Sequence, residues 1–378
     1  MLSLELGKQI RAIRKEKKLT LEDVAGDQFT KGYLSQIERG LVTPSFKVID
    51  HISDQLDIEI TQLFKMKKEK ELDFYLTKVE TYFSEKKYNQ VIDLYKDIEP
   101  PINTPLGVKL LIITAKSQYH LSQYDECINQ IKRIINNPEE WSKHYRLTGY
   151  LFMANSYFGK QDYTKAVDVY QQVLNFAEEN NLSEAEIITR AYLNTATALQ
   201  NLKKFNEAIK GFTKTLKYAK DHNLLETVLD SFIRLGYCHL KIDNLKMAKK
   251  YLYRGLKINK ILEKELPQAE ALLSLGMVFL KESNYRPGEK VVLKAYQKFQ
   301  SKDQRAGTLL SLLTVSKIYK EMKKYNLAQD YLSQFFIKLD LKDISPENIK
   351  EAANLCMSLD MNKEANVLFT HYISLKSS

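Results

Sequence analysis

The residues between Thr30 and Arg39 have the types and spacing that can read DNA bases. Leu34 and Ile37 would face inward on a short helix, so the remaining side chains would face outward. That outer face carries cations, an amide, hydroxyl groups and a glycine, a mixture that suits a helix lying in a major groove. The candidate base-contacting residues are Thr30, Lys31, Tyr33, Ser35, Gln36 and Arg39.

A cluster of basic residues precedes this segment and could contact phosphates. Six Lys and Arg residues crowd positions 8–18, and among them Arg11 and Arg14 are the candidate phosphate contacts. Residues 1–66 nevertheless contain ten Lys/Arg and ten Asp/Glu, so this region is neutral overall. The net charge of +10 therefore resides in the rest of the chain. DNA binding by residues 1–66 is thus indicated by the motif and not by the overall charge.

A second set of polar residues recurs at matching positions in the later part of the chain. Asn155 and Asn194 each offer a donor and an acceptor, so they could pair with both backbone groups of an extended peptide. Arg190 and Arg234 would suit a carboxylate. The candidate peptide-binding residues are Lys116, Tyr119, Asn155, Arg190, Asn194, Asn201, Arg234 and Tyr237. A solvated or structural role is the alternative for each of them.

Signatures of catalysis and of metal binding do not emerge from the sequence. The six histidines form no paired-ligand spacing, and no Gly-rich phosphate loop, serine elbow or Cys–His pairing is present. The three cysteines, Cys127, Cys238 and Cys356, lie far apart on helical patterns, which favours reduced, buried thiols. We therefore expect a protein that is not an enzyme and has no metal site or cofactor.

The first set of residues is positioned by a small helical domain. Thr20 can cap a short helix, with Asp23 three residues later at capping-box spacing, and Gly26 then breaks that helix. Thr30 caps the next helix, and Ser45 is a candidate cap for a fourth. Apolar residues at helical spacing complete a first and a fourth helix, and residues 60–64 suggest a short fifth. The sequence thus predicts a five-helix domain over 1–64 and a charged helical linker over 65–73.

The second set is positioned by a repeated pattern that begins after residue 73. Small residues recur in pairs twelve positions apart, which indicates antiparallel helices that approach closely where both side chains are small. These pairs are Ala115 and Cys127, Ala154 and Ala166, Ala196 and Ala208, Gly236 and Ala248, Gly276 and Gly288, Ser316 and Ala328, and Ala353 and Ala365. We expect an all-α solenoid of seven to eight helix pairs over 74–378.

These motifs resemble known families. The stretch LTLEDVA…TKGYLSQIERG, within residues 4–64, resembles the helix-turn-helix of XRE/Cro-like repressors, and Leu235-Gly236 and Leu275-Gly276 resemble the Leu-Gly step of tetratricopeptide repeats. The combination resembles the peptide-sensing transcription regulators of Gram-positive bacteria related to PlcR, NprR, PrgX and Rgg. That resemblance implies a right-handed solenoid and a homodimer on double-stranded operator DNA. It also implies a short signalling peptide in the concave groove of the repeats, held through its backbone by asparagines such as Asn155 and Asn194.

Composition agrees with a protein of the cytoplasm. Apolar residues make up 44% and charged residues 28% of 378 residues, as in globular proteins that dissolve in water. No stretch approaches the roughly 20 apolar residues that a membrane helix needs, so we expect no membrane contact.

Two other functions fit the same pattern. The repeats could bind a response regulator or a phosphorelay protein, as Rap proteins do, or they could serve only to join two repressor subunits. The helix-turn-helix motif favours a peptide-controlled DNA-binding regulator over both.

Overall fold

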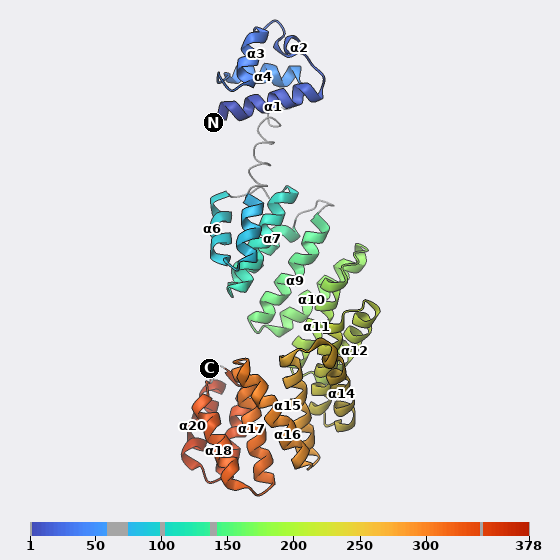
Figure 1. The fold of residues 1–378 in the computed structure, drawn as a ribbon, viewed down its shortest axis with the longest axis vertical. Helices are drawn as coiled ribbons and strands as arrows, with labels where there is room; N and C mark the ends of the chain where they lie inside the picture. The colour runs from blue at the N-terminus through green and yellow to red at the C-terminus, as the bar shows by residue number, and fades with distance from the viewer. Residues whose placement is uncertain (1, 59–74, 99–102, 137–141, 341–342, 378) are drawn as a thin grey trace. The chain divides into compact units, whose positions relative to one another are not determined.

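The computed structural model describes residues 2–58, 75–98, 103–136, 142–340 and 343–377, and all regular elements among them are helices (Figure 1). The predicted all-α class is therefore confirmed. The chain divides into two compact units, Met1–Ser156 and Tyr157–Ser378, and the division falls inside the repeat array, where the sequence shows no break.

The first unit begins with four short helices around one apolar core. They are α1 (Leu2–Glu16), α2 (Leu21–Ala25), α3 (Lys31–Glu38) and α4 (Phe46–Gln55). The core residues that are fully buried are Ile10, Val24, Leu34, Ile37, Ile52 and Leu56. The expected fifth helix at 60–64 and the linker at 65–73 lie outside the described residues, so those two boundaries stay predictions.

The predicted helix caps in this region are largely confirmed. The backbone N–H of Thr20 donates to the Asp23 carboxylate at 2.6 Å, and the backbone N–H of Asp23 donates to the Thr20 hydroxyl at 3.1 Å. The backbone bond lowers the pKa of Asp23. Gly26, with a φ of +54°, ends α2. Ser45 precedes α4 as expected, but its side chain makes no capping hydrogen bond.

Gly7 allows α1 to cross α3 at close range. A Cβ atom at this position would lie 2.0 Å from the carbonyl oxygen of Ile37, which belongs to the backbone of α3. Backbone atoms cannot move aside as a side chain can, so any larger residue would force the two helices apart. The position of α3 on its domain therefore depends on this glycine.

Helices continue through the rest of both units in the expected pairs. In the first unit, a helical segment at 75–84 precedes α6 (Tyr88–Ile98), α7 (Pro105–His120), α8 (Tyr124–Ile135) and most of α9 (Lys143–Gly159). The second unit contains α10 (Tyr163–Glu179), α11 (Ala185–Asn201), α12 (Phe205–Asp221), α13 (Leu225–Lys241), α14 (Leu245–Leu262), α15 (Glu265–Lys281), α16 (Tyr285–Ser301), α17 (Arg305–Glu321), α18 (Tyr325–Lys338), α19 (Pro346–Met357) and α20 (Asn362–Ser377).

The small residues lie where paired helices cross, as the twelve-residue spacing predicts. A Cβ atom on Gly276 would lie 2.0 Å from Cγ2 of Val292 and 3.6 Å from the carbonyl oxygen of Gly288. In the next pair, the Ser316 hydroxyl donates to the carbonyl oxygen of Ala328 at 2.6 Å. The helices therefore approach closely through these positions, and the interpretation as antiparallel pairs is confirmed.

A left-handed turn residue recurs two positions before the second helix of each pair. Lys86, Ser122, Gln161, Lys203, Asp243, Ser283, Lys323 and Asp360 have φ values from 57° to 62°. None of them is a glycine, although this backbone conformation costs an L-residue free energy. The chain thus passes from one helix of a pair to the next through the same left-handed residue, at an energetic cost in each of these turns.

Candidate functional site

The outer face of α3 is held in place by its cap and its buried residues. The Thr30 hydroxyl accepts a hydrogen bond at 3.2 Å from the backbone N–H of Tyr33, and Leu34 and Ile37 are fully buried. Opposite them, the side chains of Thr30, Lys31, Gln36 and Arg39 are exposed, and those of Tyr33 and Ser35 are half-buried. The six residues proposed to contact bases therefore share one short helix and its two caps, Thr30 and Arg39.

Three of these side chains have neighbours within the domain. Lys31 Nζ lies 2.6 Å from a carboxylate oxygen of Glu22 on α2, and this hydrogen bond raises the pKa of Lys31. The ring of Tyr33 meets the ring of Phe29 edge-on, with centroids 5.7 Å apart. Arg39 Nε donates to the Ser35 carbonyl at 3.2 Å. Because the Lys31–Glu22 pair is exposed, exchanging it for a phosphate or a base would cost little.

Arg14 does not fit the expectation of a phosphate contact. Its guanidinium is buried and donates to both oxygens of Glu38 at 2.6 and 2.8 Å, and also to the carbonyl of Leu19 at 3.0 Å. The hydrogen bond to Glu38 raises the pKa of Arg14. Its donors thus face the domain interior, where they tie α1 to the end of α3. Arg11, three residues earlier, is exposed and remains a candidate.

A groove in the second unit is built from the first helices of successive pairs. A pocket of about 350 Å³ opens there between α13, α15 and α17. Its lining residues are Gln200, Ile233, Arg234, Tyr237, Glu270, Leu273, Ser274, Met277, Phe299, Gln304, Ala306, Gly307 and Leu310. An apolar floor with a few charged and amide groups is typical of sites that bind organic ligands.

Two carboxyl groups and one guanidinium dominate the charge of this groove. Asp230 is half-buried and Glu270 is exposed at the mouth of the groove, and the surrounding protein atoms displace part of the water around both, which raises the pKa of both carboxyl groups. Arg234 lowers both pKa values by its positive charge but makes no hydrogen bond to either carboxylate. The groove therefore holds charges of both signs that are not paired with one another, so they could pair with a ligand.

The predicted peptide-binding residues are divided between the two units. Arg234 and Tyr237 line the groove of the second unit. Arg190, Asn194 and Asn201 lie on α11 of the same unit but not in the pocket lining, and Arg190 is 3.9 Å from Glu186.

The other three predicted residues, Lys116, Tyr119 and Asn155, lie in the first unit. Lys116 Nζ lies 5.4 Å from the centroid of the Phe152 ring, and the ring of Tyr119 meets Phe152 edge-on at 5.6 Å. Asn155 is a half-buried residue of α9. Their role in binding a peptide stays a prediction.

The groove also contains residues that sequence reasoning missed. Glu270 and Asp230 lie six positions before the small residues Gly276 and Gly236, which is the same offset that selected Arg190. Applying that offset to every repeat would have found both carboxylates. Ser274 lies two positions before Gly276, the offset that selected Asn194 and Arg234, so the same rule would have found it too. Gln200 and Gln304 carried no such signal, because they lie near helix ends.

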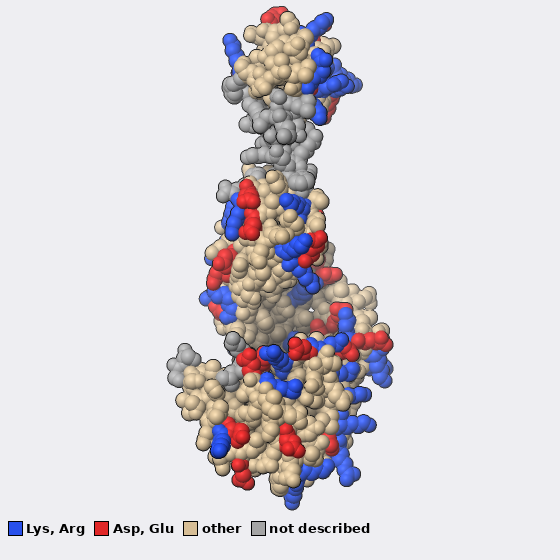
Figure 2. Space-filling view, turned by 60° about the vertical axis from the view of Figure 1, so that its left-hand side comes forward, with Lys and Arg blue, Asp and Glu red and all other residues tan. Residues whose placement is uncertain are grey.

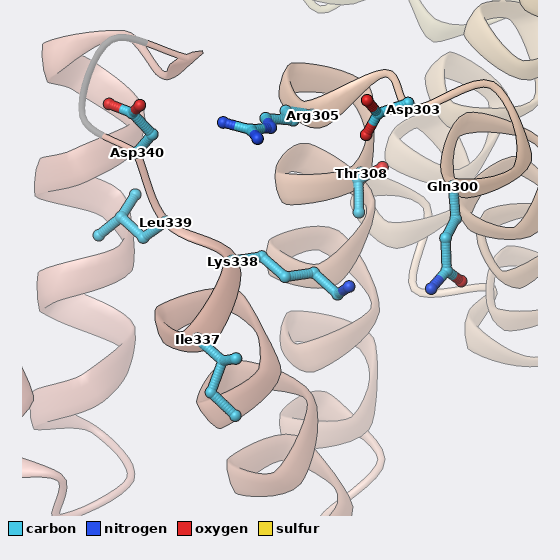
Figure 3. Close-up of a pocket in the computed structure, with 8 residues that line it drawn as sticks. All are labelled: Gln300, Asp303, Arg305, Thr308, Ile337, Lys338, Leu339 and Asp340. Carbon is cyan, nitrogen blue, oxygen red and sulfur yellow. The ribbon is translucent and has the colours of Figure 1, made fainter.

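A larger pocket of about 770 Å³ lies at the ends of α16, α17 and α18 (Figure 3). It is lined by Gln300, Asp303, Arg305, Thr308, Ile337, Lys338, Leu339 and Asp340. None of the predicted site residues lines it. We therefore regard the groove as the better candidate for a ligand site.

The three cysteines are free, buried thiols, as the sequence predicts. Burial raises the pKa of Cys127 to about 11 and of Cys238 and Cys356 to about 12. Within the described ranges, no group of His, Cys, Asp or Glu could hold a metal ion. No helix in the described part of the chain has the length and apolar character needed to span a membrane.

Two family models match the chain. A helix-turn-helix model matches residues 10–63, and a tetratricopeptide repeat model matches residues 147–180 and 229–261. No curated protein matches the chain in sequence. The matched segments are the same two modules that the motifs predict.

Solved structures share the fold at low sequence identity. The apo form of RapI is 16% identical over 71% of this chain and 97% of its own, with a TM-score of 0.58. Aspartyl phosphate phosphatase F from Bacillus subtilis is 16% identical over 90% of this chain and 94% of its own, with a TM-score of 0.55. The apo form of the quorum sensor NprR from B. thuringiensis is 12% identical over 82% of this chain and 99% of its own, with a TM-score of 0.52. The chain thus joins a helix-turn-helix domain of the XRE type to tetratricopeptide-like repeats in the fold of RapI and NprR.

Proposed function

We propose that this protein is a DNA-binding transcription regulator whose activity is controlled by a short signalling peptide. The outer face of α3 is the observation that supports DNA binding. Its exposed cations and amide stand on a helix whose opposite side is fully buried, so they can enter a major groove without disturbing the core.

The groove of the second unit supports the peptide half. Arg234 suits the carboxylate of a peptide, and Glu270 and Asp230 suit its amino group or a basic side chain. Apolar residues such as Met277 and Leu310 can bury the side chains between these charges. NprR, which shares the fold, is a quorum sensor, in keeping with a sensory role for such repeats.

A homodimer in the cytoplasm is part of this proposal. One helix-turn-helix contacts too few base pairs for tight specific binding, and proteins of this kind read two half-sites about 34 Å apart or a multiple of that distance. Two copies of α3, related by a two-fold axis, would read a palindromic operator.

The competing function is that of a Rap-type protein that binds a response regulator through its repeats. Phosphatase F, which shares the fold over most of this chain, is the observation in its favour. A Rap-type function would leave the exposed face of α3 without a role, so we favour a DNA-binding transcription regulator.

Selection from a pool of random duplexes tests the DNA-binding half. Full-length protein should enrich one sequence with two-fold symmetry and half-sites one or more helical turns apart. A variant with Lys31→Ala, Gln36→Ala and Arg39→Ala should enrich none. Failure of the unaltered protein to enrich any sequence, with or without peptide, would overturn the assignment as a DNA-reading regulator.

A further inference from the structure

The positive charge of the chain is concentrated on three helices of the second unit. Together α12, α14 and α16 contain fourteen Lys and Arg residues against three Asp and Glu, a net charge of +11. The whole chain has a net charge of +10, so these helices account for all of its excess. The corresponding helices on either side, α10 and α18, contain no such excess.

The basic residues form one stripe along each helix. On α14 they recur every three or four residues, and α14 contains no acidic residue. The stripes consist of Lys210, Lys214, Lys217 and Lys220 on α12, Lys246, Lys250, Arg254, Lys257 and Lys260 on α14, and Arg286, Lys290, Lys294 and Lys298 on α16. We call this surface the basic ridge. Figure 2 shows Lys and Arg side chains gathered along one edge of this unit.

Most cations of the basic ridge have no acidic partner. Apart from Lys298, the ridge residues are exposed, and none makes an ion pair in the described structure. Lysines elsewhere in the same unit behave differently, because Lys281 pairs with Asp243 and Lys317 pairs with Glu351. Unpaired like charges repel one another, so the cations of the basic ridge destabilise the folded unit. A bound anion would reduce this repulsion.

We propose that the basic ridge contacts the phosphates of duplex DNA without reading its sequence. On α14, five cations from Lys246 to Lys260 span about 21 Å at a rise of roughly 1.5 Å per residue. Duplex DNA carries one negative charge per about 1.7 Å, so it can meet such a stripe along its whole length. An acidic patch on a folded protein offers a shorter and less regular run of charge. Duplex DNA therefore fits the basic ridge better.

This contact goes beyond the proposed function, which places DNA only at α3. A second phosphate contact on the same chain would raise the affinity for any sequence and leave the choice of operator to α3. It would hold the protein on the chromosome between operators.

A charge-reversed variant tests the basic ridge. Lys250→Glu, Arg254→Glu and Lys257→Glu would be introduced together into the full-length protein, because all three are exposed and unpaired. The matched control carries Lys323→Glu, Lys338→Glu and Lys363→Glu, three exposed lysines outside the basic ridge, with the same change in charge. Binding of a random-sequence duplex would be measured by fluorescence anisotropy over a series of salt concentrations.

The ridge variant should bind at least tenfold more weakly at low salt, and the slope of log K against log salt should become shallower by about 2 to 3, at roughly 0.9 per lost phosphate contact. The control should change little. Glutamine substitutions at the same three ridge positions should give a smaller loss in the same direction. These effects should persist when Lys31, Gln36 and Arg39 are replaced by alanine, so failure of the ridge and failure of α3 are distinguishable.

Equal losses in the ridge variant and the control would overturn the proposal. Binding of poly-glutamate that is tighter than binding of duplex DNA at the same charge concentration, and that is lost in the same ridge variant, would also overturn it. That result would identify an acidic protein surface as the partner.

Discussion

Arg11 and Arg14 lie three residues apart on α1 and have different surroundings. Arg11 is exposed, whereas both oxygens of Glu38 and the Leu19 carbonyl accept hydrogen bonds from Arg14. Glu38 belongs to the motif that ends α3, so the same glutamate that helps identify the motif also removes Arg14 from the surface. A one-dimensional pattern identifies basic residues but cannot show which of them pairs inside the fold.

Replacing Arg14 should therefore affect stability more than DNA contacts. Arg14→Ala leaves the Glu38 carboxylate buried without its partner, which should cost about 3 kcal/mol. Hydrogen exchange of the α3 amides in the full-length protein measures this loss directly. Arg11→Ala is the control and should change the same opening free energy by less than about 0.5 kcal/mol. Similar effects of the two variants would contradict the role of Arg14 in the domain interior.

Gln36 should instead affect DNA sequence recognition. Its side chain is exposed on the outer face of α3 and can hydrogen-bond to a base edge, so Gln36→Ala should cost about 1–3 kcal/mol on the selected operator. The loss on random DNA should be small. Gln28→Ala, an exposed glutamine outside α3, should change neither affinity. Anisotropy titrations measure the affinity of each variant for the operator and for the random duplex. Equal losses of affinity on both duplexes would show that Gln36 does not contact bases.

The carboxyl groups of the groove should make the stability of the second unit depend on pH. Partial loss of hydration raises the pKa of Glu270 and Asp230 above their unfolded values, so the folded state binds more protons than the unfolded state at pH values between the unfolded and the folded pKa. Their contribution to the free energy of unfolding therefore rises as the pH falls through that window, and it is lowest at neutral pH.

The variant with Asp230→Asn and Glu270→Gln isolates this effect. It should exceed the unaltered protein in melting temperature at pH 7, and the difference should shrink as the pH falls towards the usual carboxyl range. A control with Glu207→Gln and Asp330→Asn, two carboxylates on α12 and α18 outside the groove, should show no such trend. A difference that stays constant with pH would show that neither groove carboxyl has a raised pKa.

At the scale of elements, the helix pairs were predictable and the turns between them were not. The small residues twelve positions apart located each crossing, because close packing of two helices restricts side-chain size at one place on each. The left-handed turns had no such signal, since lysine, serine, glutamine and aspartate all occupy that position. Which charged side chains face the same groove was also not evident from the sequence, because that depends on which helices become neighbours.

A glycine at one of these turns should stabilise the array. Lys323 has a φ of 59° and an exposed side chain, so Lys323→Gly should relieve backbone strain and raise the free energy of unfolding by roughly 0.5–1 kcal/mol. The neighbouring Lys324 has a φ of −93°, and Lys324→Gly should not stabilise the protein. Chemical denaturation of both variants compares them. Destabilisation by Lys323→Gly would mean that the turn is not strained.

At the scale of the whole second unit, the repeat array brings distant parts of the chain together. Lys203, in the turn after α11, lies 2.5 Å from Glu347 in the first turn of α19, across 144 residues of sequence. This ion pair is exposed and contributes little stability of its own. Small rotations between successive repeats add along a solenoid, so they would change the distance between Lys203 and Glu347. A ligand bound across α13, α15 and α17 lies between these two points of the chain.

The proposed control mechanism depends on unequal binding. A peptide in the groove can change operator affinity only if it binds two arrangements of the repeats with different free energies. A coupling of about 1–3 kcal/mol would correspond to a change in operator affinity of roughly 5–150-fold. Arg234 in the groove and Asn194 on α11, the helix that contacts α13, are the residues proposed to hold the peptide. Their removal should uncouple the two sites without affecting α3.

Operator affinity in the presence and absence of peptide is the most direct test of this account. A short synthetic peptide that binds the full-length protein by calorimetry would be added to operator titrations of the unaltered protein and of the Asn194→Ala, Arg234→Ala and Arg305→Ala variants. We expect the peptide to shift operator affinity at least fivefold in the unaltered protein and in Arg305→Ala, which lies outside the groove. The same peptide concentration should have no effect on Asn194→Ala or Arg234→Ala, whose peptide-free operator affinity should be unchanged. Operator affinity that no bound peptide alters in the unaltered protein would contradict the account.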